Sequence, residues 1–168
     1  MPDARVERVT GMGMLTLRGA MDVLGPALGE VCALAAPDQR MSEAQGGLRA
    51  NWMSPDEIMV VCPVERTADL AHRLEERLTG AFATVVDVSD ARAAFDVTGL
   101  DAAGVLTKLM PVDFARMQPA EVRRTRMAQI PATCWCEGRG WRVVCFRSVA
   151  AYADALLRNA AASAVAGT

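Results

Sequence analysis

The chain has 168 residues, the size of one ordinary domain. Hydrophobic residues make up 52% and charged residues 23%, which excludes a disordered chain, since that would be poorer in apolar residues and more one-sided in charge. The net charge of −2, from 18 basic and 20 acidic residues, predicts no general attraction for nucleic acid or an anionic membrane.

The composition also bears on the compartment. Acidic residues stand at the start of the chain, where a signal peptide would be basic, and no apolar run approaches the ~20 residues needed to cross a bilayer. The cysteines are odd in number and lie mostly in hydrophobic runs, as reduced thiols of a cytosolic protein do. We therefore expect a soluble cytoplasmic protein. The five cysteines are Cys32, Cys62, Cys134, Cys136 and Cys145.

The first half of the chain predicts the order β-α-β-β-α-β. Residues 1–10 are expected to be frayed and residues 35–47 to form a loop, because glycine, proline and serine interrupt any periodicity there. The two clearest signals are a hairpin turn at 54–56 and a leucine-lined helix that Gly80 ends. The expected elements are a strand at 13–18, a weak helix at 21–31, strands at 48–53 and 57–62, a helix at 65–79 and a buried strand at 82–88.

The second half predicts the order β-α-β-β-β-α. Asp101 is expected to N-cap a short helix that Pro111 ends, and Ser148 to cap the last helix, with fraying from about residue 160 to residue 168. Gly138-Arg139 reads as a two-residue hairpin turn. The expected elements are a strand at 91–98, a helix from 101, a strand at 121–130, strands at 132–137 and 140–147, and a helix from 148.

The two halves therefore repeat a similar pattern, over about residues 13–88 and 91–163. Their starts lie about 75 residues apart, roughly the length of one split βαβ unit. We predict a single α+β domain, residues 1–168, made of two split βαβ (ferredoxin-like) units with antiparallel sheets.

Few side chains in the sequence suit catalysis. His72, the only histidine, lies about 200° around its predicted helix from Leu70 and Leu74 and is expected to face water without a catalytic partner. Paired carboxylates such as Glu75 and Glu76 lie on the solvated face of the same helix. No glycine-rich phosphate-binding loop precedes a strong helix.

The cysteines near the second hairpin raise the question of zinc. Pairing across Gly138-Arg139 places Cys136 opposite Trp141 and Cys134 opposite Val143, with Cys145 on the same face. Zinc ligand pairs need two to four intervening residues, and a fourth ligand is missing, so the pattern favours core packing.

Arginines gather in the second half of the chain. They face only three carboxylates between residues 113 and 147, a local charge of +4, which leaves open an RNA-contacting surface. Because the sequence offers no aromatic stacking platform on the same strands, a charged protein-binding face or a solvated sheet face is favoured. The arginines are Arg116, Arg123, Arg124, Arg126, Arg139, Arg142 and Arg147.

Several ordered motifs resemble a known family. Residues 85–92 (VVDVSDAR) and 97–102 (VTGLDA), followed by 105–106 and 112–113, are similar to the folate-binding aminomethyltransferase superfamily. Within that superfamily, three further segments resemble the gamma subunit of heterotetrameric sarcosine oxidase, and together the motifs span residues 14–159. Those segments are 52–58 (WMSPDEI), 126–131 (RMAQIP) and 147–152 (RSVAAY).

This resemblance implies a non-catalytic, structural subunit of a complex that oxidises sarcosine to glycine. FAD, FMN, NAD, tetrahydrofolate and zinc would be held by the alpha, beta and delta subunits, with no cofactor, metal, nucleic acid or membrane bound by this chain. The segment 128–133 lacks the carboxylate with which folate-using relatives position a one-carbon intermediate, in agreement with that role. Ile58 ends the segment 52–58, where an aromatic residue is usual in the gamma-subunit family.

Two other functions stay open: a free-standing folate-binding one-carbon module, and a ferredoxin-like regulatory or RNA-contacting domain. For the subunit reading, Trp135 opposite Arg142 on the outer face of the hairpin is the expected partner contact, because exposed tryptophan and arginine are over-represented at interfaces. An isolated cation–π pair on a solvated sheet is the alternative for these two residues.

Overall fold

Each half of the chain folds as an antiparallel sheet with two helices on one side. The computed structural model describes residues 4–163, and these residues separate into two compact units. The first-half unit comprises residues 11–90, and the second-half unit comprises residues 91–163 together with residues 4–10.

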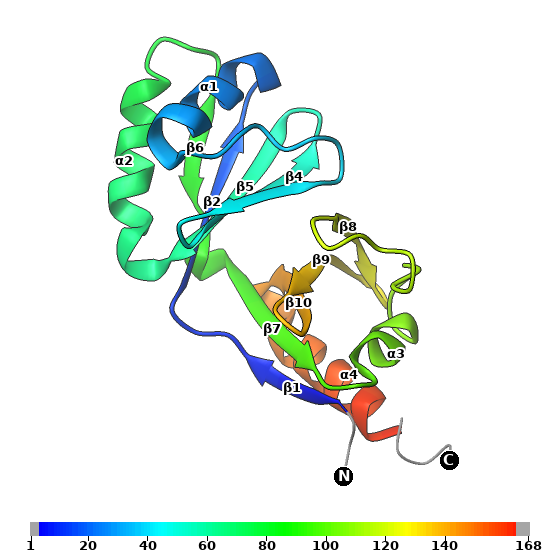
Figure 1. Cartoon of the computed structure of the whole chain (residues 1–168). Helices are drawn as coiled ribbons and strands as arrows, with labels where there is room; N and C mark the ends of the chain where they lie inside the picture. Colours follow the sequence, from blue (N-terminus) through cyan, green and yellow to red (C-terminus); the bar gives the residue numbers. More distant parts are fainter. Residues whose placement is uncertain (1–3, 164–168) are drawn as a thin grey trace. The chain divides into compact units, whose positions relative to one another are not determined.

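The first-half unit has a five-stranded sheet in the order β3-β4-β5-β2-β6. Helices α1 and α2 cover one face of this sheet (Figure 1). Its elements are β2 (Met12–Arg18), α1 (Met21–Cys32), β3 (Ser42–Gln45), β4 (Leu48–Ser54), β5 (Glu57–Pro63), α2 (Thr67–Arg77) and β6 (Thr84–Asp87).

The core of this unit follows from alternation in the strands and helical spacing in α2. Leu15 and Leu17 point from β2 to the helices, and Leu70 and Leu74 point back from α2; all four are fully buried. Gly13 lies on the same face of β2, where a Cβ atom would come within 1.9 Å of Thr67 Oγ1. The glycine therefore lets the start of α2 pack closely against β2.

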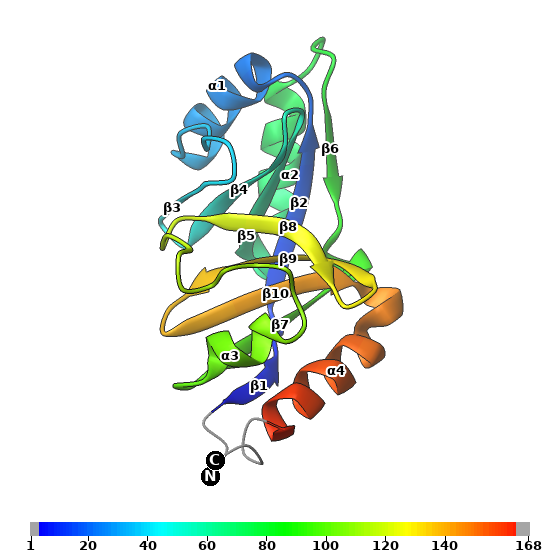
Figure 2. The ribbon, with the colours of Figure 1, turned by 90° about the vertical axis from the view of Figure 1, so that its right-hand side faces the viewer.

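The second-half unit has a five-stranded sheet in the order β1-β7-β10-β9-β8. Helices α3 and α4 lie against one face of it (Figure 2). Its elements are β1 (Arg5–Arg8), β7 (Arg92–Thr98), α3 (Ala102–Thr107), β8 (Val122–Met127), β9 (Ile130–Glu137), β10 (Gly140–Phe146) and α4 (Ala150–Ser163).

The two sheets share one strand order. In the first-half unit, β2, which precedes the first helix, lies between β5, which precedes the second helix, and an outer strand. In the second-half unit, β7 has the same place between β10 and an outer strand. That outer strand is β6 in the first-half unit and β1 in the second, although β1 comes first in the chain. The ferredoxin-like α+β fold predicted from the sequence is thereby confirmed.

The prediction of a frayed N-terminus is wrong for residues 5–8. They form β1, which pairs with β7 so that Val6 lies opposite Val97, and both side chains are buried in the core. The sequence around Val6 alternates over too few residues to signal a strand, and its partner is about 90 residues away. At the other end, α4 continues to Ser163, so residues 160–163 are helical rather than frayed; residues 1–3 and 164–168 lie outside the described residues.

Three local predictions also need correction. The expected loop at 35–47 contains the short strand β3, whose polar residues hide its pairing with β4. The expected buried strand at 82–88 is the outer strand β6, with Val86 exposed and Phe82 outside the strand and exposed. Asp101 stands at the N-cap of α3, but its side chain makes no capping hydrogen bond.

Candidate functional site

The second hairpin has the register that the sequence predicts. Strands β9 and β10 pair Cys136 with Trp141, Cys134 with Val143, and Trp135 with Arg142. One face of the hairpin, with Cys134 and Val143, joins the core beneath α3 and α4. The other face carries Trp135 and Arg142.

The expectation that Trp135 is exposed is wrong. The tryptophan has none of its surface accessible, and its indole Nε1 donates a hydrogen bond of 2.8 Å to Glu137 Oε2, two residues along the same strand. A buried indole needs such an acceptor, because an unpaired N–H group costs free energy in the interior. Trp135 is therefore a packed side chain and not an exposed anchor.

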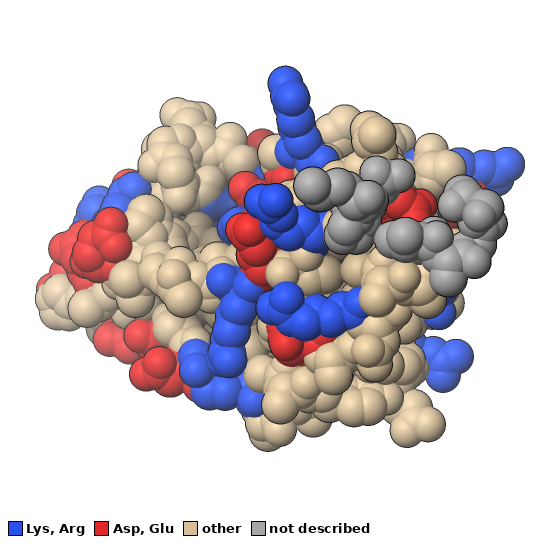
Figure 3. All heavy atoms as spheres, turned by 90° about the horizontal axis from the view of Figure 1, so that it is seen from below, with Lys and Arg blue, Asp and Glu red and all other residues tan. Residues whose placement is uncertain are grey.

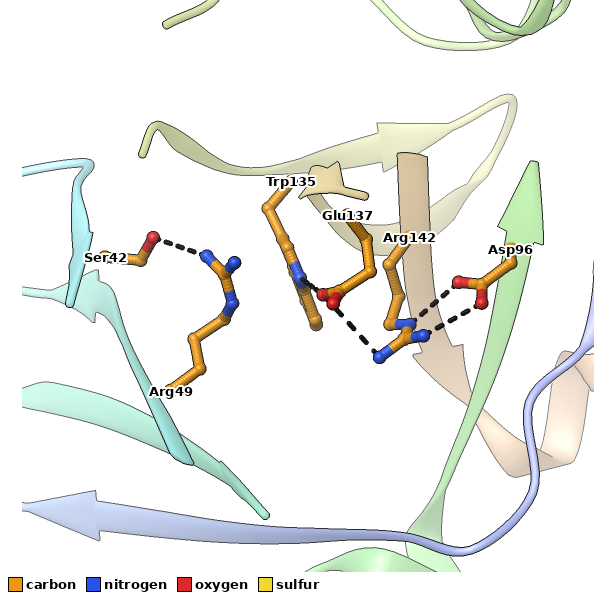
Figure 4. A network of polar contacts seen from close by, with 6 residues as sticks. All are labelled: Ser42, Arg49, Asp96, Trp135, Glu137 and Arg142. Carbon is orange, nitrogen blue, oxygen red and sulfur yellow. Dashed lines mark hydrogen bonds and ion pairs between the residues drawn. The ribbon is translucent and has the colours of Figure 1, made fainter. Parts of the chain in front are cut away.

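Arg142 has a fixed set of acidic neighbours (Figure 4). It lies opposite Asp96 of β7, and its Nε and Nη2 donate to the two carboxylate oxygens at 2.8 Å each. Its Nη1 lies 3.6 Å from Glu137 Oε2, the acceptor of the Trp135 indole. Burial acts to lower the pKa of Arg142, but the hydrogen bonds and charge of Asp96 raise it overall, so the guanidinium stays charged.

These four side chains form one polar row across three strands. Hydrogen bonds and an ion pair join Asp96 on β7 to Arg142 on β10, Arg142 to Glu137 on β9, and Glu137 to Trp135 on the same strand. A bidentate arginine–carboxylate pair fixes geometry as well as charge. The row can therefore hold the strands in register, and its charges are engaged with each other. The alternation of residues 91–98 places Asp96 on the face opposite to Phe95 and Val97. No pattern in the sequence indicates that the Glu137 side chain reaches both Trp135 and Arg142.

The first-half unit has its own cross-strand ion pair. Arg18 of β2 lies opposite the buried Glu57 of β5, and its Nη2 donates to Glu57 Oε2 at 2.8 Å. On the neighbouring strands, Arg49 donates to the Ser42 hydroxyl at 2.7 Å (Figure 4). Both contacts tie adjacent strands together.

Two cysteines of the second hairpin are core residues, and the third, Cys136, is partly exposed. Cys134 and Cys145 are buried against the helices, and burial raises the pKa of the Cys134 thiol to about 12. The pKa of Cys145 is raised for the same reason. Because the thiolate is the reactive form, both thiols are chemically inert at neutral pH. Within residues 4–163 there is no group of three or more His, Cys, Asp or Glu side chains placed to hold a metal ion.

His72 lies on the exposed face of α2, as predicted. Its Nε2 is 3.4 Å from Glu76 Oε1, one helical turn further on. This is an ordinary surface pair at i, i+4 spacing, with both side chains largely in water.

Arginines of the predicted cluster form ion pairs with carboxylates of the same unit. Arg142 pairs with Asp96, Arg123 with Glu121, and Arg116 with Asp113. The other four, Arg124, Arg126, Arg139 and Arg147, are exposed.

One aromatic residue of these strands reaches the surface. Phe146 at the end of β10 has 44% of its surface exposed, and the guanidinium carbon of Arg92 lies 4.0 Å from its ring centroid. Because Phe146 follows Cys145 on the strand, alternation places its ring on the face opposite to Cys145.

Other large apolar side chains also reach the surface. Phe82 and Leu100 are almost completely exposed, and Val86 on the outer strand β6 is half-exposed. Large exposed aromatic residues are unusual enough to mark contact surfaces when they cluster with other apolar groups. None of the helices in the described part of the chain has the length and apolar character to cross a membrane.

The geometry defines a two-unit, ferredoxin-like α+β protein, and solved structures show where else this fold occurs. The chain is similar to a chain of the heterotetrameric sarcosine oxidase from Corynebacterium sp. U-96, solved in complex with pyrrole 2-carboxylate. The identity is 23% and the TM-score 0.88, over 95% of this chain and 84% of that one. The likeness that the sequence motifs predicted is thus confirmed for the fold.

Two further structures share the fold over most of this chain. The glycine cleavage system aminomethyltransferase T from Bartonella henselae has 16% identity and a TM-score of 0.72 over 92% of this chain, which spans only 45% of that protein. The regulatory subunit of aspartate kinase from Thermus thermophilus has 12% identity and a TM-score of 0.51 over 93% of this chain and 97% of that one. No family model and no curated protein matches the sequence.

Proposed function

We propose that this chain is a non-catalytic, gamma-type subunit of a sarcosine oxidase-type complex, in which it has a structural or assembly role. The observation that carries the proposal is the likeness to a chain of heterotetrameric sarcosine oxidase, which covers 95% of this chain and 84% of that one at a TM-score of 0.88. A chain that is similar over most of its length can occupy the same kind of place in an assembly.

The chemistry of the side chains supports a role without catalysis. The histidine is a solvated surface residue beside Glu76, and the thiols of Cys134 and Cys145 are buried and hold their protons at neutral pH. The charged row around Arg142 is engaged in holding three strands. FAD, FMN, NAD and tetrahydrofolate are accordingly assigned to the alpha, beta and delta subunits, and the five free thiols suit the cytoplasm.

The outer strand of the first-half unit supplies a surface for such a partner. Strand β6 pairs with β2 on one side only, and Val86 on β6 and Phe82 just before it are exposed. Outer strands with apolar side chains are ready sites for contact with another chain. We place a contact with one of the other subunits of the complex here.

A pull-down tests this proposal. The tagged chain is expressed with candidate alpha, beta and delta subunits, and the eluate is examined for subunits and for flavin absorption. We expect a yellow complex with the wild-type chain. The double variant Phe82→Ser/Val86→Ser should retain less of the other subunits. Tyr152→Ser is the matched control, because Tyr152 is an exposed aromatic residue of the other unit. A colourless, solitary chain would contradict the subunit role, whereas equal retention of both variants would contradict only the placement of the contact.

The likeness to aminomethyltransferase T favours a second candidate, a free-standing folate-binding module. Binding of tetrahydrofolate to the native chain would raise its melting temperature with ligand concentration. An unchanged melting temperature at saturating folate would rule out this candidate and leave the subunit proposal in place.

A further inference from the structure

The small net charge of the chain conceals two strongly charged units of opposite sign. Residues 11–90 contain six basic and twelve acidic side chains, a net charge of −6. Residues 4–10 and 91–163 contain twelve basic and seven acidic side chains, a net charge of +5, and Asp3 brings the total to −2. The sequence-based expectation of no general attraction for nucleic acid or an anionic membrane used the total charge alone, whereas the second-half unit by itself is basic.

Part of this positive charge lies at one end of the sheet face away from α3 and α4. On that face, Arg92 of β7 lies opposite Phe146 of β10, and Arg126 of β8 lies opposite Pro131 of β9. Pro131 precedes Ala132, which is paired with Cys145, so Phe146 and Pro131 follow each other across the sheet. Four residues therefore form a row across the sheet: Arg92, Phe146, Pro131 and Arg126. We call this row, together with the neighbouring Arg124, the arginine patch.

The arginine patch is accessible. Phe146, Pro131, Arg124 and Arg126 are exposed, and Arg92 is half-buried over the Phe146 ring. The next positions inward on these strands are the uncharged residues Ala94, Val144 and Thr133. A space-filling view shows Lys and Arg side chains grouped on a face of the molecule, with acidic side chains among and beside them (Figure 3).

The side chains of the patch suit a protein rather than a nucleic acid. Proteins that bind single-stranded nucleic acid stack successive bases on several exposed aromatic rings. The patch has one such ring, Phe146, and Arg92 already covers one side of it. Arginine forks bind carboxylates bidentately, and exposed phenylalanine and arginine are enriched at protein interfaces. We propose that the arginine patch docks an acidic segment of a partner protein, with carboxylates on the arginines and an apolar side chain on Phe146.

This inference rests on the proposed subunit role only for the identity of the partner. Its direct test uses the full chain and a labelled, glutamate-rich peptide with one leucine, followed by fluorescence anisotropy at increasing salt. The double variant Arg124→Glu/Arg126→Glu is compared with Arg66→Glu/Arg73→Glu, which changes the net charge equally but lies on exposed positions of the acidic unit. Melting curves establish that each variant is folded.

We expect the Arg124/Arg126 variant to bind the peptide about tenfold more weakly, the Arg66/Arg73 control to change by less than about twofold, and binding to weaken with salt. Phe146→Ala, which leaves the charge unchanged, is expected to weaken binding as well. Equal losses in the two charge variants would overturn the proposal. Binding of a uridine 12-mer in preference to the peptide would also overturn it, in favour of an RNA surface.

The same charge variants in the pull-down separate this inference from the proposed function. Loss of partner subunits from the Arg124/Arg126 variant alone supports the arginine patch as a docking site in addition to the contact proposed at β6. A complex that assembles equally well with both variants leaves the subunit role intact and contradicts the patch. A wild-type chain that binds the peptide but no subunit contradicts the subunit role and keeps the patch.

Discussion

Arg142 and Asp96 lie directly opposite each other on β10 and β7, and two hydrogen bonds of 2.8 Å join the guanidinium to the carboxylate. Both side chains are mostly withdrawn from water. Replacing Asp96 by Ala would remove both hydrogen bonds, and Glu137, at 3.6 Å from Nη1, would remain as a more distant acidic neighbour of the Arg142 guanidinium. We expect the free energy of unfolding to fall by about 1–3 kcal/mol, measured by urea denaturation.

The control for this variant is Asp154→Ala. Asp154 also accepts from an arginine, Arg158, but the pair lies one helical turn apart on the exposed face of α4. Exposed pairs of this kind contribute under about 0.5 kcal/mol. Equal losses of stability in the two variants would contradict the structural role assigned to the row around Arg142.

The buried thiol of Cys134 predicts a stability change at alkaline pH. Burial raises the pKa of Cys134 from 9.0 to about 12, so the folded protein keeps the thiol proton at pH values where the unfolded chain loses it. This contribution is complete below pH 9 and is lost as the pH rises from 9 towards 12. Between pH 8 and pH 10, wild type should lose about 1 kcal/mol more than Cys134→Ala, measured by denaturation at each pH. Parallel pH profiles would show that Cys134 does not carry the effect.

The N-terminal strand is expected to stabilise the second-half unit. Val6 is buried in the core of that unit and pairs with Val97. Val6→Ala should lower the free energy of unfolding by about 1–3 kcal/mol and speed hydrogen exchange in β7. Glu7→Ala, at the next and exposed position of β1, is the control. If exchange in β7 is unchanged by Val6→Ala, β1 does not hold the edge of the sheet.

Two glycines are expected to respond in opposite directions to alanine. A Cβ at Gly13 would meet Thr67 Oγ1 at 1.9 Å and Cys62 Sγ at 2.9 Å, so Gly13→Ala should cost about 1–3 kcal/mol. Gly29 lies inside α1, where the nearest atom is 3.9 Å away, so Gly29→Ala should stabilise by up to about 1 kcal/mol. Thermal unfolding of both variants checks this pair, and a stabilising Gly13→Ala would contradict the close packing of α2 on β2.

The elements that could be predicted from the sequence are those with strong local signals. The leucines of α2 recur at helical spacing, and the second hairpin combines alternation with a glycine turn, so its register was correct to the residue. The missed strands β1 and β3 have four residues each, too few for periodicity to show. The partner of β1 is β7, about 90 residues further along the chain. The residues of β3 are mostly polar and exposed, so no apolar alternation marks it as a strand.

The candidate site was predicted only in part. The pairing of Trp135 with Arg142 was correct, but alternation cannot tell an exposed sheet face from a buried one, so Trp135 was placed in water. The link to Glu137 depends on side-chain rotamers. The separation of charge between the units could have been found, had the charges been counted for each half of the chain.

The most direct test of the subunit role is size-exclusion chromatography of the chain co-expressed with candidate alpha, beta and delta subunits, followed at 280 nm and at the flavin band near 450 nm. We expect this chain to elute in the same peak as the flavin absorption, in a constant ratio to the other subunits. Elution of this chain in a separate, colourless peak, while the other subunits remain assembled and yellow, would contradict the subunit role.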